Sequence, residues 1–599
     1  MRQSGHHLSV IILSRLSIDI HFNGFMRTLF FSVISLVVLT TSMVSCTKKY
    51  DVVVVGGTPG GVMTAISASR MGKSVLVLER TKVVGGLPAN GLGATDIATR
   101  GATTGLFLEF VNRVKEYYVK EYGPDSQQVK DCSSGYHFEP SVAARIFSEM
   151  LSECPNVTVM TMRQFDSEPS NIEMDGTRIK SIRILDRVTG KKEVFKGKVF
   201  VDATYEGDLA AAAGVPFKIG REGKDEFNEP IAGKVYKYWR GPVGEGTTYE
   251  GDNTIQAYNY RLCLTRNKDN MVPFRKPDNY DREEYVSLID DILYGYHTGV
   301  ATLEVTDKQR EENKKAILSG GRTMIPDDRW GVAKITNMVT LPNGKTDANN
   351  QHMAFISTDL PEENWQWPTA SWEWRDAFAK RLREYTEGLF WFAANDEAVP
   401  ASFREEVKGW GFAADEYTDN DNFPRQVYVR EGRRFEGMYF FTANDAELPT
   451  DRGPLHRDAI TASHYALDSH AHHKREPGRI HLEGFLSYPT VPYNVPYGVI
   501  VPKNVSNLLF PVPVSGSHTG FSTLRMEPCW MALGQAAGTA AALAIDEGTT
   551  VQRVDIPTLQ NELLKQGATL VYMKGHSPSD PDFIKIQKEA LSKASESGI

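Results

Sequence analysis

A cluster of histidines and carboxylates between residues 456 and 481 is well suited to acid–base chemistry. Six of the 14 histidines of the chain fall in this stretch. Asp468 and His470 lie two residues apart, and one of them can orient the other while it takes or gives a proton. Two other interpretations stay open. One is a solvated polar loop, and the other is a metal site, which lacks a His-Glu-x-x-His pattern or a cysteine partner. We expect Asp468 and His470 to line a catalytic pocket, and we predict no metal.

A second group of charges lies at Arg430, Arg433 and Arg434. Guanidinium groups bind carboxylates and hydroxyl-rich ligands through several donors at once. One of these arginines could therefore hold an anionic or polyhydroxylated substrate. A network of ion pairs on one face of a helix explains the same spacing equally well.

The segment from Tyr50 to Glu79 reads as one βαβ unit that binds a dinucleotide. A β-branched run leads into a glycine turn, a helix of small residues, and a second apolar run that ends at Glu79. In such a unit the turn brings backbone N–H groups to the pyrophosphate, and the acid takes the ribose hydroxyls. Glu79 lies 23 residues after Gly56, close to the roughly 20 that this arrangement needs. The alternative is a plain βα turn in another α/β protein.

The glycine turn departs at one position from the pattern G-x-G-x-x-G. Its middle glycine lets the pyrophosphate approach, and this chain has Thr58 there. Gly56 and Gly61 are in place, and the N–H and hydroxyl of a threonine can still donate to phosphate. We therefore predict a variant site rather than a lost one. The predicted cofactor-binding residues of this unit are Gly56, Gly57, Thr58, Pro59, Gly60, Gly61 and Glu79.

Three separated segments resemble signatures of the FAD-dependent oxidoreductases whose flavin domain is of the glutathione-reductase or fumarate-reductase type. They are a glycine doublet soon after Glu79, a strand that ends in Asp-Ala-Thr, and a last strand and helix between residues 507 and 542. The resemblance implies FAD as the cofactor, with NAD(P) alone as the main alternative. More narrowly, the chain is similar to secreted bacterial members that have no established substrate. The further cofactor-binding residues that the resemblance implies are Arg80, Gly85, Gly86, Asp202, Ala203, Thr204 and Glu527.

The last of these segments also carries two candidates for catalysis. His518 follows the final strand of the flavin domain, where it could take a hydroxyl proton as hydride leaves carbon. A histidine that only bonds the cofactor or a loop carbonyl is the alternative. Arg525 could hold a flavin carbonyl or a substrate oxygen, or it could form a structural ion pair with Glu527. Pro528 fits the first turn of the last helix, whose N-terminus would face the flavin.

The N-terminal region resembles a bacterial lipoprotein signal. From Met26 a positive start is followed by a short apolar run and by small residues ahead of Cys46. We expect lipidated Cys46 to hold the protein at a membrane surface, in the periplasm or at the outer membrane. Residues 1–25 then form an upstream extension, with Met26 as the start. An uncleaved anchor or an ordinary cleaved signal is the alternative.

Composition excludes some partners. The net charge is −8 and the pI is near 6.0, and no basic run suggests a groove for an anionic polymer, so we expect no nucleic-acid partner. A small-molecule substrate is expected instead. Cys132, Cys154, Cys263 and Cys529 have no redox or metal spacing. Buried free thiols are the expectation, with one structural disulfide as the alternative.

The predicted fold class is α/β, a discontinuous Rossmann-like FAD-binding domain with an inserted α+β substrate or cap domain. A helix is expected over Trp372–Trp391, with Ser371 as its N-cap. The predicted organisation is an extension and signal over 1–46, FAD-binding parts over 50–220 and 500–550, a cap over 221–499 and a helical tail over 551–599.

Three functions fit the sequence. The first is an FAD enzyme that oxidises a hydroxyl carbon of a small polar or carbohydrate-like substrate by hydride transfer to flavin N5. The second is a flavin-dependent C=C reductase or eliminase. The third is a non-catalytic binding protein on the same fold, which Thr58 and the loading of FAD after export would favour. The sequence identifies neither the substrate nor the electron acceptor.

Overall fold

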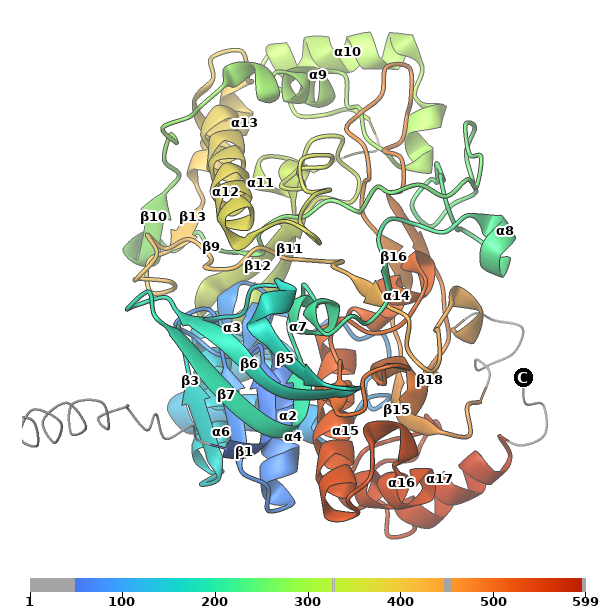
Figure 1. Ribbon diagram of the computed structural model, residues 1–599. Coiled ribbons are helices and arrows are strands. Elements are labelled where there is room, and N and C mark those ends of the chain that lie inside the picture. The colour runs from blue at the N-terminus through green and yellow to red at the C-terminus, as the bar shows by residue number, and fades with distance from the viewer. Residues whose placement is uncertain (1–48, 326, 328, 447–454, 595–599) are drawn as a thin grey trace, which may run out of the picture. The chain divides into compact units, whose positions relative to one another are not determined.

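A mixed eight-stranded sheet carries the βαβ unit that the sequence predicts. Figure 1 shows β1, β3, β5, β6 and β7 of this sheet. The computed structural model describes residues 49–325, 327, 329–446 and 455–594. The strands of this sheet are β1 (Lys49–Val55), β2 (Val75–Leu78), β3 (Val157–Met160), β4 (Arg163–Gln164), β5 (Ile172–Asp175), β6 (Arg178–Asp186), β7 (Lys192–Asp202) and β19 (Leu508–Leu509). The predicted Cys46 signal lies outside the described residues.

β1 occupies the middle of the parallel part of this sheet. It pairs in parallel with β2 on one side and with β7 on the other, and β3 extends the sheet beyond β2. Val52, Val53 and Val54 are fully buried, as expected of a parallel strand covered on both faces. β19 adds to β7 in parallel, so a segment near residue 508 returns to the sheet that begins at residue 49.

Helix α2 (Pro59–Arg70) begins directly after the glycine turn for identifiable reasons. Thr58 is its N-cap and accepts a hydrogen bond from the N–H of Gly61, which satisfies one of the free donors of the first turn. Pro59 follows at the first helical position, where a missing N–H costs nothing.

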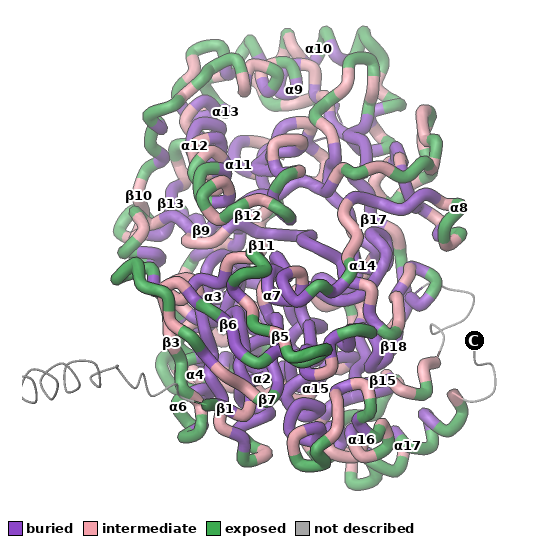
Figure 2. The backbone as a smooth tube through the Cα atoms, in the orientation of Figure 1, coloured by how far each residue is buried: buried purple, intermediate pink, exposed green. Residues whose placement is uncertain are grey.

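Helix α15 (Glu527–Asp546) packs on α2 with backbone touching backbone. A Cβ on Gly534 would lie 2.0 Å from the carbonyl oxygen of Gly60, and one on Gly538 would lie 2.3 Å from that of Thr64. Because the contacts advance together along both helices, α2 and α15 run in the same direction. Figure 2 shows this region as buried, and Pro528 lies in the first turn of α15 as predicted.

A second, antiparallel sheet lies between the two parts of the first one in the sequence. Its strands are β9 (Leu262–Thr265), β10 (Met271–Pro273), β11 (Thr336–Leu341), β12 (Lys345–Asn350) and β13 (Gly411–Ala413). The long helix beside it is α12 (Trp372–Asn395), and Ser371 caps it by accepting from the N–H of Trp374. The predicted helix and its N-cap are confirmed. The predicted boundaries between flavin and cap domains stay a prediction, because residues from Lys49 onward form one compact unit.

Short strand pairs and further helices complete the described chain. The pairs are β8 (Phe217–Lys218) with β14 (Arg434–Phe435), β15 (Ala459–Ser463) with β18 (Tyr493–Pro496), and β16 (Leu467–Ser469) with β17 (Leu486–Tyr488). The helices are α3 (Gly86–Asn90), α4 (Leu106–Tyr122), α5 (Gln127–Asp131), α6 (Pro140–Ser152), α7 (Asp208–Ala212), α8 (Lys224–Phe227), α9 (Ser287–Leu293), α10 (Asp307–Leu318), α11 (Val332–Ile335), α13 (Ala401–Lys408), α14 (His518–Leu524), α16 (Ile556–Lys565) and α17 (Phe583–Ser592).

Two properties of the interior bear on the sequence predictions. Cys132, Cys154, Cys263 and Cys529 are free and buried, so free thiols are confirmed and a disulfide among these four is wrong. Within the described ranges, α15 alone is long and apolar enough to cross a membrane, and 94% of its apolar window is buried. We therefore regard α15 as a core helix.

Gly534→Ala is expected to destabilise the fold. The added methyl group has no room against the backbone of Gly60, and overpacking of this kind costs about 1–3 kcal/mol of unfolding free energy. Urea unfolding of parent and variant measures the loss. Gly244→Ala is the control, because its Cβ would meet no atom closer than 3.4 Å. Equal stability of the two variants would contradict the packing account.

Candidate functional site

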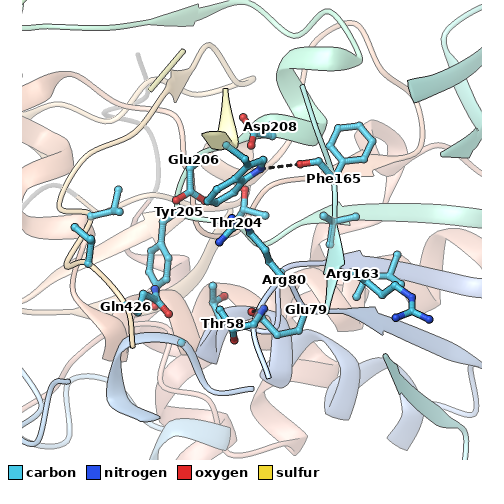
Figure 3. A pocket seen from close by; sticks show the side chains of 18 of the residues that line it. Thr58, Glu79, Arg80, Arg163, Phe165, Thr204, Tyr205, Glu206, Asp208 and Gln426 are labelled. Atoms are coloured by element: carbon cyan, nitrogen blue, oxygen red, sulfur yellow. Dashed lines mark hydrogen bonds between the residues drawn. The ribbon is translucent and has the colours of Figure 1, made fainter. Parts of the chain in front are cut away.

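A cavity opens where the parallel strands of the main sheet end. It encloses about 830 Å³, part of it open to solvent, and Figure 3 shows the side chains that line it. Its walls include residues at the carboxyl ends of β1, β2 and β7, which is where open α/β sheets bind ligands. The N-terminal part of α12 and the segment 425–429 form further walls. Six residues predicted to bind the cofactor line it: Gly56, Thr58, Glu79, Arg80, Gly86 and Thr204.

The glycines at the cavity are fixed by close approach and by backbone conformation. Gly56 has a φ of +100°, and a Cβ there would lie 2.6 Å from the carbonyl oxygen of Ala203. Gly86 has a φ of +50°, and a Cβ there would lie 2.4 Å from the hydroxyl of Tyr205. Gly85 connects the doublet to the glycine turn, since its N–H donates to the carbonyl of Gly57 at 2.7 Å. Only glycine fits these positions without strain.

Glu79 lies at the end of β2, as a ribose-binding acid must. Its Oε2 accepts from the N–H of Gly57 at 2.7 Å, and its Oε1 accepts from the N–H of Thr81 at 2.7 Å. Each carboxylate oxygen has a second lone pair. Glu79 can therefore hold the turn in place and still accept hydrogen bonds from ribose hydroxyls.

Thr58 acts differently from the expectation. Its hydroxyl donates to the carbonyl of Ala203 at 2.7 Å and accepts from the N–H of Gly61. The hydroxyl therefore joins the turn to the end of β7 and is not free to donate to phosphate. Gly60 and Gly61 serve packing, since a Cβ on either would meet backbone atoms at 3.0 Å or less.

Asp202 and its neighbours shape the wall of the cavity from behind. Asp202 is fully buried and accepts from the N–H and hydroxyl of Thr204 and from the N–H of Ala210. Burial raises the pKa of Asp202 to about 6. The Asp-Ala-Thr segment thus fixes the turn after β7, and Thr204 is the member that reaches the cavity.

Arg80 forms a polar and aromatic wall with the start of α12. Its guanidinium lies 3.8 Å from the ring centroid of Trp372 and donates to Asp376. The indole N–H of Trp372 donates to the carbonyl of Phe165 at 2.9 Å, which Figure 3 marks. This wall offers a flat face and a cation to a nucleotide.

Tyr205 links the cavity to the start of α15. Its hydroxyl donates to Oε1 of Glu527 at 2.6 Å and accepts from the N–H of Leu87. Burial raises the pKa of Glu527 to about 8. Among the described residues, Glu527 Oε2, Arg525 Nε and Trp530 Nε1 are buried polar atoms without a hydrogen-bond partner. With Glu527 protonated and its Oε1 accepting from Tyr205, all three atoms are unpartnered donors at a helix N-terminus, and they fit the acceptor edge of a flavin ring.

Asp468 and Arg525 form one ion pair, and His470 lies beside it. Arg525 Nη2 donates to Asp468 Oδ2 at 3.0 Å, and its Nη1 donates to the hydroxyl of Tyr428. His470 Nε2 lies 3.8 Å from the same Asp468 oxygen. The alternative that pairs Arg525 with Glu527 is therefore wrong. Arg525 comes just before α15 in the chain. The ion pair therefore lies next to the unpartnered polar atoms of Glu527 and Trp530.

Asp359, and not Asp468, orients the ring of His470. His470 Nδ1 lies 2.7 Å from Asp359 Oδ2, and Asp359 also pairs with Arg430 at 3.0 Å. Burial lowers the pKa of His470, and the nearby Arg430 lowers it further. The imidazole is consequently neutral near pH 7, with its Nδ1 proton on the carboxylate side and a lone pair on Nε2.

His518 lies at the first position of α14, and its Nε2 is 3.4 Å from the hydroxyl of Ser469, the residue between Asp468 and His470. His518 Nδ1 lies 2.7 Å from Glu431 Oε2, and its N–H donates to Glu222. Burial acts to raise the pKa of Glu431, but the adjacent His518 and Arg434 bring that pKa below its ordinary value. His518 borders a separate small cavity together with Ser469, and neither His518 nor His470, Asp468 and Arg525 lines the cavity at the strand ends.

The three arginines near residue 430 lie in extended chain that leads into β14, so the predicted helix face is wrong. All three are buried and paired with carboxylates: Arg430 with Asp359, Arg433 with Asp208 at 2.6 Å and Arg434 with Glu222 at 2.7 Å. Their charges hold elements together inside the protein. They are not free to bind a substrate.

Comparison with known proteins identifies the family. The sequence profile of a family described as FAD dependent oxidoreductase matches residues 51–563, which is most of the chain. This protein belongs to the FAD dependent oxidoreductase family. FAD is its cofactor, and the residues at the strand ends and at the start of α15 fit that group.

Curated relatives match only a short part of this chain. Soluble pyridine nucleotide transhydrogenases from Mycobacterium bovis and Mycobacterium tuberculosis are 44% identical over 43 residues. The match spans 7% of this chain and 9% of each relative. Whole-protein activities of these relatives are therefore not carried over to this oxidoreductase.

Solved structures match part of the fold. A myxobacterial chondrochloren halogenase is 18% identical, with a TM-score of 0.22, over 36% of this chain and 49% of the other. A bacillithiol disulfide reductase from Bacillus cereus is 17% identical, with a TM-score of 0.19, over 31% of this chain and 46% of the other. Likenesses this partial support no conclusion about the substrate of the oxidoreductase.

Several residues of the site were not predicted from the sequence. Tyr205 and Glu206 follow the Asp-Ala-Thr segment directly, and burial raises the pKa of Glu206 to about 7. Proximity to that signature could have indicated both. Asp359, Glu431 and Tyr428 come from loops far away in the sequence. Only the fold shows which histidine or arginine each one contacts.

Glu79→Gln is expected to weaken FAD binding about tenfold, because the amide nitrogen cannot accept from Gly57 or from the ribose, and a lost hydrogen bond to a charged group costs about 1.5–3 kcal/mol. Titration of the FAD-free protein with FAD, followed by flavin fluorescence, measures the dissociation constant. Glu173→Gln, at an exposed position of β5, is the control. An unchanged dissociation constant in Glu79→Gln would contradict this assignment.

Glu527 should make the stability of the FAD-free protein pH-dependent. Its pKa is raised from 4.5 to about 8, so the folded state holds a proton that the unfolded state releases. The stability is fully present below the unfolded pKa and is lost as pH rises toward 8, by up to about 1.4 kcal/mol per pH unit. Urea unfolding between pH 5 and 8 should show a shallower fall for Glu527→Gln than for the parent. Identical slopes would show that Glu527 is not protonated in the folded state.

Proposed function

We propose that this oxidoreductase oxidises a hydroxyl-bearing carbon of a small polar or carbohydrate-like substrate. The observation that carries the proposal is the Asp359–His470 pair, which lies with Arg525 at the N-terminus of α15. That arrangement supplies a base and a cation next to the polar atoms that fit the flavin ring.

His470 is the proposed base. Its Nδ1 hydrogen bond to Asp359 fixes the tautomer and the ring orientation, so Asp359 is a positioning residue. Because the pKa of His470 is lowered by burial and by Arg430, Nε2 is unprotonated at neutral pH. A neutral imidazole of this kind accepts a proton from an alcohol.

The proton and the hydride leave the substrate for different groups. FAD, when bound, supplies the acceptor for the hydride and its two electrons. The C–H and O–H bonds of the alcohol break, a C=O bond forms, and the hydroxyl proton goes to Nε2 of His470. Arg525, whose charge is anchored by Asp468 and Tyr428, stabilises negative charge that develops on the substrate oxygen.

Replacing His470 tests this assignment. We expect His470→Asn to slow the anaerobic bleaching of bound flavin by about 10²–10⁴-fold, the usual contribution of a general base. The measurement mixes the FAD-loaded protein with pooled sugars and hydroxy acids and follows visible absorbance. Asp359→Asn should slow it less and shift its pH profile, since the base remains but its tautomer is no longer fixed.

Two further histidines serve as comparisons. His473 is partly exposed and lies 3.4 Å from Glu362, so His473→Asn should bleach like the parent. If His518→Asn abolishes bleaching while His470→Asn leaves it intact, the base is His518 and the proposal is wrong. A flavin that no hydroxyl compound bleaches, but that an electron-poor alkene reoxidises after chemical reduction, would favour a C=C reductase.

We also propose that the enzyme works outside the cytoplasm, attached to a membrane surface by lipidated Cys46. The support is the sequence alone, a positive start and an apolar run before Cys46. Fatty-acid labelling of the expressed protein tests it, with Cys46→Ser expected to remove the label. Label on both forms, or on neither, would contradict this localisation.

A further inference from the structure

We propose that a cavity beside β11, lined by His297, Arg329 and His352, binds a carboxylate of the substrate. In naming the substrate class this inference rests on the proposed hydroxyl oxidation. It makes the substrate a hydroxy acid of carbohydrate type, such as a sugar acid. The cavity has a volume of about 290 Å³, close to the lower end of the range for small-molecule sites.

His297 places an unpaired donor at this cavity. His297 is only 2% exposed. Nδ1 accepts from the N–H of Gly299 at 3.1 Å, so the ring proton is on Nε2. Among the described residues, His297 Nε2 is a buried atom with no hydrogen-bond partner. A buried donor without a partner is costly unless a ligand or water accepts from it.

Arg329 adds a second unpaired donor and a positive charge. Its Nε donates to Asp327 Oδ1 at 2.6 Å, whereas its Nη1 is buried without a partner in the described structure. Lys334 binds the other oxygen of Asp327 at 2.5 Å. Asp327, which also lines the cavity, is therefore shared by two cations, and Asp291 acts on Lys334 as well. The unpartnered Nη1 of Arg329 is the charged donor that remains for an anionic ligand.

A row of packed aromatic rings leads from His352, which lines this cavity, toward His470. The ring of His352 stacks on Trp239 at 4.9 Å, Trp239 lies 5.2 Å from Phe485, and Phe485 lies 5.5 Å from His470. Trp239 has a φ of +55°, which a bulky side chain rarely adopts and which is often kept at functional sites. Phe485 and His470 are buried, so the rings of this row that can offer a face to a ligand are the partly exposed His352 and Trp239.

His352 lines the cavity together with Arg329. Burial and the charge of Arg329 lower the pKa of His352 to about 4, so its ring is neutral near pH 7 and brings no charge to the cavity. A ligand whose carboxylate meets Arg329 and His297 would place its hydroxyl groups beside His352, where the row of rings that leads to His470 begins.

Calorimetric binding to the FAD-loaded protein tests the inference. The probes are D-glucuronate, D-galacturonate and D-gluconate, each compared with its neutral counterpart D-glucose, D-galactose or D-glucitol. We expect at least one acid to bind at least tenfold more tightly than its counterpart. Arg329→Gln should remove this preference, and Arg329→Lys, which keeps the charge, should retain part of it. Arg322→Gln, at an exposed position seven residues away, should bind like the parent.

The outcomes separate this inference from the proposed function. Equal binding of acids and neutral sugars, or no binding of any acid at millimolar concentration, would overturn the carboxylate site. Loss of preference in Arg322→Gln as well as in Arg329→Gln would also overturn it. An acid that binds through Arg329 but never bleaches the flavin would leave the site standing and contradict hydroxyl oxidation. If neutral sugars bleach the flavin and no acid binds more tightly than its neutral counterpart, hydroxyl oxidation stands and the carboxylate site is overturned. Thermal unfolding and flavin absorbance of each variant confirm that it is folded.

Discussion

Helices α2 and α15 touch through their backbones, and the rest of the site depends on this contact because it brings both N-termini to the same edge of the sheet. The contact of Gly534 with Gly60 leaves no space for a side chain, and the helices run in the same direction. Their N-termini, each a region of partial positive charge, therefore point the same way, with the start of α15 about 9 Å further along this direction than the start of α2. One follows the glycine turn at the cavity, and the other faces Tyr205 and Arg525. A cofactor with a phosphate at one end and an electron-accepting ring at the other matches that pair of helix ends.

Around these helix ends the buried charges occur as ion pairs, and each charge is stable there only because its partner is present. Arg525 with Asp468, Arg430 with Asp359 and Arg434 with Glu222 are all buried, and removing one partner of such a pair leaves an uncompensated charge at a cost of about 3–5 kcal/mol. The pairs hold loops that carry no regular structure of their own. The positions of Asp359 and Tyr428 beside the site thus depend on electrostatics as much as on the packing of apolar side chains.

The βαβ unit and the last helix could be predicted from the sequence, because their signals are local. A continuous apolar run predicts a buried strand, a glycine turn predicts the start of the next helix, and Ser371 before a periodic segment predicts the N-cap of α12. Each of these signals depends only on residues close by in the sequence. The partners of His470 and Arg525 could not be predicted, since Asp359 and Tyr428 lie about a hundred residues away from them. Thr58 shows the same limit: a free hydroxyl was expected, but the approach of Ala203 from β7 occupies it. Long-range contacts decide which polar groups remain available for chemistry.

The structure of the FAD-loaded protein is the most direct test of where the cofactor binds. We expect the pyrophosphate at the N-terminus of α2, the ribose at Glu79, and the flavin ring at the start of α15 beside Arg525, with His470 facing the substrate side of the ring. A flavin ring placed beside His518, or a cofactor bound away from the carboxyl ends of β1, β2 and β7, would contradict this expectation.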